Sequence, residues 1–233
     1  MIEIRPAAQR GRSHFDWLDS RHTFSFGDYH HPRHAGFRSL RVLNDDHVEP
    51  ACGFDRHPHR DMEIVSLVLE GALQHEDSLG SGGTIRPGEV QRMSAGTGII
   101  HSEWNPSQTD KVHFLQIWFT PRMKSRAPGY EQRALPATRN AFHLVASGTA
   151  EADAVAIDAD ADLWRACLDA GAEVSLPLQR GGQAWFHVAR GTVELAGLSG
   201  RPMIEGDGAK FTDVGEVRVT ATTDAEILVF DLG

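Results

Sequence analysis

Cysteine, basic residues and long apolar runs are all scarce in this chain of 233 residues. Its two cysteines, Cys52 and Cys167, are too few for a disulfide framework or for a metal site built on cysteine. No apolar run comes close to the roughly 20 residues that a transmembrane helix needs, and the first residues lack the apolar segment of a secretion signal. We therefore expect a protein of the reducing cytoplasm that does not bind membranes.

Acidic residues outnumber basic ones, with 32 Asp and Glu against 23 Lys and Arg, which gives a formal net charge of −9. That charge would repel a phosphate backbone, and no basic cluster in the sequence counteracts it. We expect no direct binding to nucleic acid, whereas a protein partner is compatible with the charge. Histidine is plentiful, and 11 of the 13 histidines precede residue 114. Because histidine is the commonest protein metal ligand, we expect any metal chemistry in the first half of the chain.

Helical periodicity is scarce, and short apolar runs separated by glycine, proline, Asp and Asn take its place. Runs rich in Val, Ile, Phe and Trp between turn residues are typical of β-strands in a sandwich or barrel. The clearest runs are residues 37–43, 63–69, 112–119, 184–188, 192–195, 216–220 and 226–232. Residues 162–170 are the best candidate for a helix, although the segment is short. The sequence therefore predicts an all-β protein with few short helices.

Two pairs of candidate metal ligands have the same spacing, His57-Pro-His59 and His101-Ser-Glu103. On a β-strand, residues i and i+2 point to the same face, so each pair would present two ligands together. If the two strands are neighbours, three imidazoles and one carboxylate converge, and that set suits Fe(II), Mn(II), Ni(II), Cu(II) or Zn(II). A His-x-His pair by itself is equally typical of a strand face in solvent. The second pair with the same spacing favours the metal site.

The residues around these pairs resemble the two motifs of the cupin superfamily and, within it, the pirin family with its bacterial quercetin 2,3-dioxygenase-like members. The matching strings are HPHRDMEIV from His57, LEGAL from Leu69, DSLG from Asp77, MSAG from Met93 and HSE from His101. Nearly all of this resemblance lies in residues 2–135. The second half resembles the family only in its length and strand pattern.

The resemblance implies a bicupin, which consists of two tandem β-barrels with one mononuclear metal in the first. We expect an N-terminal cupin barrel with the metal site in residues 1–135 and a C-terminal cupin-like barrel without a metal site in residues 136–233. In the second barrel, a single histidine, His187, stands where a His-x-His pair would be needed. One imidazole does not make a mononuclear site, so we expect this barrel to cover or support the first.

Carried over residue by residue, the metal ligands of the pirin family fall on His57, His59, His101 and Glu103. Ordinary cupins instead use the glutamate of their first motif, which is Glu63 in this sequence. Glu63 therefore stays open as an alternative fourth ligand.

Four protein ligands leave open positions on an ion that takes five or six, which is typical of a catalytic metal. The resemblance implies a metal-dependent dioxygenase that opens the flavonol ring of quercetin-like substrates with O₂ and releases CO. Fe(II) is the favoured cofactor, with Zn, Mn, Ni and Cu as alternatives, and Glu103 is the candidate catalytic base for the substrate hydroxyl. Two other functions stay open: a redox-sensitive, non-enzymatic regulator of pirin type, and another cupin enzyme such as an isomerase.

Overall fold

The computed structural model describes residues 1–149, 151, 153–198 and 200–233. In this described part, regular structure consists of β-strands and two short 3₁₀ helices, η1 (Ala7–Gln9) and η2 (Pro32–His34). The all-β prediction is therefore confirmed. The chain divides into two compact units. We call them the N-terminal unit (Gly11–Leu135 with Val155–Ala159) and the C-terminal unit (Met1–Arg10, Pro136–Ala154 and Asp160–Gly233).

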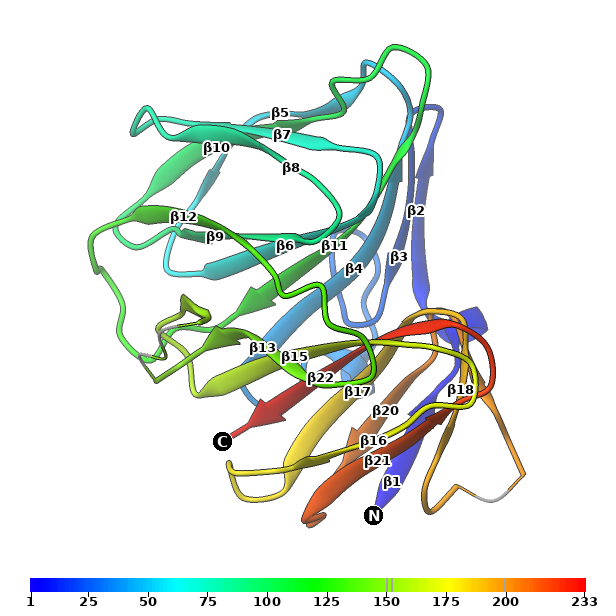
Figure 1. Cartoon of the computed structure of the whole chain (residues 1–233). Coiled ribbons are helices and arrows are strands. Elements are labelled where there is room, and N and C mark those ends of the chain that lie inside the picture. The colour runs from blue at the N-terminus through cyan, green and yellow to red at the C-terminus, as the bar shows by residue number, and fades with distance from the viewer. Residues whose placement is uncertain (150, 152, 199) are drawn as a thin grey trace. The chain divides into compact units, whose positions relative to one another are not determined.

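The N-terminal unit contains two antiparallel sheets that form separate layers in Figure 1. The larger sheet contains, in spatial order, β12 (Gly129–Ala134), β9 (Glu89–Ser94), β6 (Glu63–Glu70), β11 (Val112–Phe119), β4 (Leu40–Val48), β3 (Leu18–His22) and β2 (Gly11–Phe15). The smaller sheet contains β5 (Gly53–His59), β10 (Ile99–Trp104), β7 (Leu73–Asp77) and β8 (Gly82–Ile85). The short strand β14 (Val155–Ala156) also belongs to this unit.

Apolar side chains from both sheets fill one end of the N-terminal unit. The cluster consists of Leu18, Val48, Val68, Leu73, Ile85, Val112 and Phe114. Side chains on a strand alternate between its two faces, so the same strands that contribute Phe114 and Val48 to this core can also present polar residues further along. Polar residues stand at two such inward positions, Gln116 on β11 and Asn44 on β4, and these two residues lie opposite each other. Packing thus closes one end of the unit and leaves polar groups inside the other.

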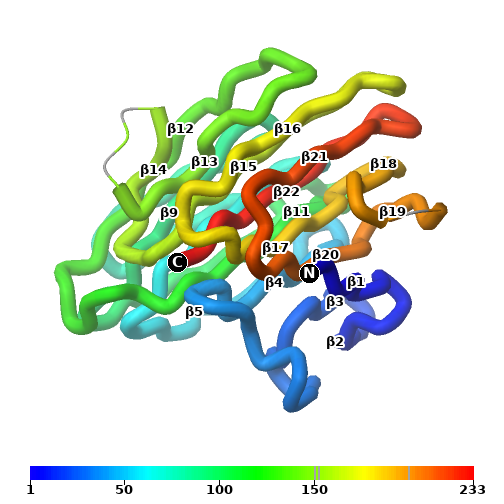
Figure 2. The backbone as a smooth tube through the Cα atoms, turned by 90° about the horizontal axis from the view of Figure 1, so that it is seen from below, coloured from blue at the N-terminus to red at the C-terminus, as the bar shows by residue number. Residues whose placement is uncertain are grey.

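The C-terminal unit also contains two antiparallel sheets. One sheet contains, in order, β1 (Ile2–Arg5), β20 (Gly208–Phe211), β17 (Gln183–Arg190), β22 (Ala225–Leu232), β15 (Ala161–Leu168) and β13 (His143–Ser147). The other contains β16 (Glu173–Pro177), β21 (Glu216–Ala221), β18 (Thr192–Leu195) and β19 (Met203–Ile204), and Figure 2 shows β16 and β21 running side by side. The core of the C-terminal unit is strongly apolar and includes Phe186, Phe211, Val217, Ile227 and Val229.

Two expectations about the chain differ from the structure. Residues 162–170 are not helical: β15 covers most of them and pairs with β22 along its whole length, because buried apolar residues recur at the spacing of a strand. The first residues, expected in the barrel of residues 1–135, belong instead to the C-terminal unit, because Ile2 pairs with Phe211 across β1 and β20.

Candidate metal centre

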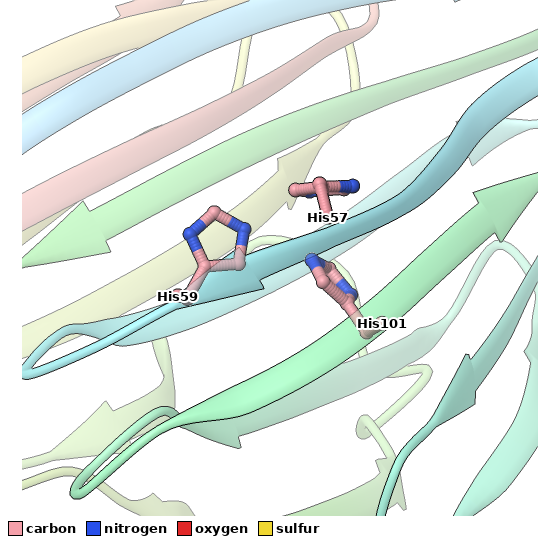
Figure 3. Close-up of side chains that lie close together, drawn as sticks. All are labelled: His57, His59 and His101. Atoms are coloured by element: carbon pink, nitrogen blue, oxygen red, sulfur yellow. The ribbon is translucent and has the colours of Figure 1, made fainter.

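Three histidines meet on the inner face of the smaller sheet of the N-terminal unit. His57 and His59 come from β5, and His101 comes from the neighbouring strand β10, where it pairs directly with His57. The ring centroids are 4.4 Å apart for His57 and His101, 4.8 Å for His57 and His59, and 4.9 Å for His59 and His101. Figure 3 shows the three rings gathered over the two strands. One nitrogen from each ring lies within 4.8 Å of the other two, so the strand spacing gathers three potential ligands around one point.

The electrostatic state of these rings favours metal binding. Burial, together with repulsion from His57, lowers the pKa of His59 to about 4. Burial and the neighbouring histidines lower the pKa of His101 to about 2. Both rings are therefore neutral at physiological pH, and a neutral imidazole has the free lone pair that a metal ligand needs. The Nε2 atom of His101 is buried and has no hydrogen-bond partner in the described part of the chain. A bound cation would satisfy it, so these residues fit a mononuclear metal.

Glu103 lies two residues after His101 on β10 and is buried. Gln116 donates from Nε2 to both carboxylate oxygens, at 3.1 and 2.9 Å, and Ser66 Oγ donates to Oε1 at 3.4 Å. Burial raises the pKa of Glu103 to about 7, and the hydrogen bonds from Gln116 and Ser66 oppose this shift. A carboxylate oxygen of Glu103 lies within 4.8 Å of ligand atoms of His75 and His101. The structure thus places Glu103 beside His101 but not in the group that His101 forms with His57 and His59, and the role of Glu103 as fourth ligand stays a prediction.

Glu63, the alternative ligand, faces other groups. If one regular strand continued past His59, Glu63 would share its face, but β5 ends at His59 and β6 begins at Glu63. Asp61, in the turn between them, has a positive φ of 50°. The Glu63 carboxylate accepts a hydrogen bond from Ser94 Oγ at 2.7 Å, and among the described residues it joins none of the potential metal-binding clusters. The geometry therefore favours Glu103 over Glu63.

His75 is a part of the site that the sequence analysis did not identify. It lies on β7, directly opposite Glu103 of β10, and is fully buried. Its Nδ1 is 3.3 Å from Nδ1 of His101, and its Nε2 is 3.5 Å from Oδ2 of Asp77. If Nε2 of His101 binds a metal, Nδ1 of His101 carries the proton and donates a hydrogen bond to Nδ1 of His75, which fixes the ring orientation. The spacing of His75 and Asp77, which places both on one strand face, was the available signal in the sequence.

A cavity of about 340 Å³ extends from the histidine cluster into the N-terminal unit. Its aromatic walls are Phe15, Trp17, Phe26, Phe54 and Trp118, and polar groups come from Ser13, Ser20, His22, Asn44 and Asp46. Trp118 stands edge-on to His59, with ring centroids 4.9 Å apart. The volume lies within the range of about 300–1,000 Å³ that is usual for small-molecule sites. The candidate metal site therefore opens into a space that suits an aromatic ligand.

Another group of potential ligands, Asp45, His47 and His113, lies on the opposite face of the larger sheet. There His113 Nε2 and Asp45 Oδ1 are 2.7 Å apart. Because Asn44 and Asp46 on the same strand line the cavity, Asp45 points away from it.

In the C-terminal unit, His187 is buried in β17. The absence of a metal site in that unit remains a prediction. In the described part of the chain, no helix has the length and apolar character needed to cross a membrane.

Comparison with known proteins agrees with this geometry. The Pirin family model matches residues 3–119, and the model named Quercetinase C-terminal cupin domain matches residues 144–232. The chain is 40% identical to quercetin 2,3-dioxygenase of Escherichia coli K12, over 100% of this chain and 99% of that protein. It also resembles two crystal structures of YhhW from Escherichia coli at 40% identity, covering 100% of this chain. One has a TM-score of 0.94 with 98% of that chain covered, and the other, the bacterial pirin in complex with nickel(II), has 0.93 with 99% covered. The bicupin prediction is confirmed, and the chain belongs to the pirin family.

Proposed function

We propose that this protein is a metal-dependent dioxygenase that opens the flavonol ring of quercetin-like substrates with O₂ and releases CO. The observation that carries the proposal is the position of three clustered imidazoles and a buried carboxylate at the wall of an aromatic cavity of about 340 Å³. The name of the Escherichia coli relative, quercetin 2,3-dioxygenase, supports the same reaction.

His57, His59 and His101 would hold the metal, with Glu103 as the fourth ligand. Nitrogen and carboxylate donors admit several divalent ions. We favour Fe(II), with nickel as a strong alternative because a related pirin is known in complex with nickel(II). When bound, the metal supplies a Lewis acid for the substrate hydroxyl and a path for electrons to O₂.

Glu103 would remove the proton of the flavonol 3-hydroxyl group. Burial disfavours the charged carboxylate and so favours the neutral form that Glu103 would take on accepting this proton. Gln116 and Ser66 fix the carboxylate through their hydrogen bonds. In the overall reaction both atoms of O₂ enter the product, the heterocyclic ring opens to a phenolic ester, and the carbon that bore the hydroxyl leaves as CO. The aromatic walls would hold the substrate rings and exclude water.

The test is turnover of quercetin in air by protein loaded with one equivalent of Fe(II), Ni(II), Mn(II), Cu(II) or Zn(II). We expect loss of the flavonol absorbance with release of one CO per substrate with at least one of these metals. The matched variants are Glu103→Gln, which should lose turnover, and Asp45→Asn, which should keep it because Asp45 lies on the other face of the sheet. Metal-loaded protein that leaves quercetin intact with all five ions would refute the proposal.

A further inference from the structure

A row of polar side chains crosses the floor of the cavity and leads away from Glu103. Gln116 of β11 pairs with Asn44 of β4, and Asn44 pairs with His22 of β3, so the three side chains lie on the same face. Neighbouring strands are about 4.8 Å apart, which places Asn44 about 5 Å and His22 about 10 Å across the sheet from Gln116. Since Gln116 binds the Glu103 carboxylate, the row connects the candidate metal end of the cavity to its far wall.

Hydrogen bonds fix this far wall. His22 Nδ1 lies 2.8 Å from Asn44 Oδ1, and His22 Nε2 lies 2.8 Å from Ser13 Oγ. An amide oxygen only accepts, so Nδ1 of His22 is the donor and Nε2 accepts from the Ser13 hydroxyl. Ser20 Oγ donates to Oδ1 of Asp46. The five side chains thus have defined donor and acceptor roles, and four of them are at least 97% buried, namely Ser20, His22, Asn44 and Asp46.

Two groups of this network face the cavity with hydrogen-bonding capacity for a ligand. The amide nitrogen of Asn44 makes no hydrogen bond within the described residues, and it can donate two. Asp46 contributes a carboxylate on the same strand, and side chains two residues apart share a face. A donor beside a charged acceptor suits a hydroxyl group, which both accepts and donates. Burying the Asn44 amide nitrogen against aromatic walls is costly unless a partner satisfies it, and the Asp46 carboxylate, which already accepts from Ser20, has lone pairs for a further hydrogen bond.

We propose that Asn44 and Asp46 form a subsite for hydroxyl groups on the ring of a phenolic substrate that lies away from the metal. The inference rests on the proposed function and extends it, because it predicts selectivity for polyhydroxylated substrates. The metal end would bind any ligand with the chelating hydroxyl. The subsite would discriminate among such ligands by their remaining hydroxyls.

The experiment compares two ligands that share the chelating group, quercetin and 3-hydroxyflavone, which lacks every other hydroxyl. Dissociation constants are measured by quenching of tryptophan fluorescence, with nickel-loaded protein and without O₂, so that turnover plays no part. Wild type should bind quercetin more tightly. Asp46→Asn should weaken quercetin binding about tenfold, since a charge-assisted hydrogen bond is roughly twice as strong as a neutral one. Asn44→Ala should have a similar effect, and both should leave 3-hydroxyflavone binding within about twofold.

Asp45→Asn is the matched control, because it makes the same substitution on the same strand but faces away from the cavity. Bound nickel and circular dichroism identify folded variants, and either cavity variant is sufficient for the test. Equal binding of the two flavonols by wild type, or equal loss of both in the variants, would overturn the subsite and leave the proposed function standing. Failure of wild type to bind either flavonol would contradict the proposed function, and the subsite with it.

Discussion

Replacing Glu103 by Gln should remove one proton's share of the pH dependence of metal binding. In the metal-free protein, burial raises the pKa of Glu103 to about 7. A cation needs the charged carboxylate, so binding below this pH must first remove a proton. His59 and His101, with pKa values of about 4 and about 2, are already neutral between pH 5 and 8 and add no slope there. The contribution of Glu103 to metal affinity should therefore rise with pH up to about 7 and then level off.

The size of the effect follows from the same pKa. At pH 5, two units below it, Glu103 is ionised in about one molecule in 100, so Glu103 alone should make the affinity about 100-fold lower than at pH 8. The Glu103→Gln variant should bind the metal more weakly than wild type at pH 8. Its metal affinity should also change less with pH, by about one proton released per metal bound. Competition with a chelator, followed from pH 5 to 8, measures this, and effects of pH on the chelator cancel between variants.

Glu63→Gln is the control, since burial also raises the pKa of Glu63 but this residue lies outside the histidine cluster. It should keep the full slope. Equal slopes in wild type and Glu103→Gln would show that Glu103 gives up no proton to the metal, and the reasoning about its burial and its role as ligand would fail.

Three further predictions concern the neighbours of this group. Protein purified without added metal should contain close to one equivalent, and His57→Ala should lose most of it; equal metal content by elemental analysis would remove His57 from the ligand set. His75→Leu should weaken metal binding about 10- to 100-fold, because Nδ1 of His101 loses its acceptor 3.3 Å away. His75→Gln, which keeps an acceptor oxygen, should recover part of it, and equal affinities in a titration would argue against orientation by His75. Gly53→Ala should lower the free energy of unfolding by about 1–3 kcal/mol, because its Cβ would lie 2.2 Å from the Glu103 carbonyl oxygen. Gly215→Ala is the control, because no described atom lies within 4 Å of the added Cβ. Chemical denaturation measures both variants, and an equal loss of stability in the two would contradict the steric argument for Gly53.

Strand parity explains how much of the site is predictable from sequence. The spacing of His57 and His59 requires only a regular strand, and β5 is regular over both. The same parity fails for Glu63, because the turn at Asp61 breaks the strand before it. His75 depends on β7 lying next to β10, and that neighbour relation is set by long-range pairing. The pairing of β1 with β20 joins residues about 200 positions apart and has no local signal.

The inner face of the larger sheet shows why composition alone could not locate the cavity. Along β11, Phe114 is packed in the core, whereas Gln116, two residues later on the same face, binds Glu103. Burying a polar side chain costs stability unless it is hydrogen-bonded, and a row of such residues across neighbouring strands repeats that cost. Local strand patterning predicts the inward positions but cannot tell which of them will find partners across the barrel. The partners of Gln116 lie on β6 and β10, so the polar floor of the cavity exists only once the two sheets have assembled.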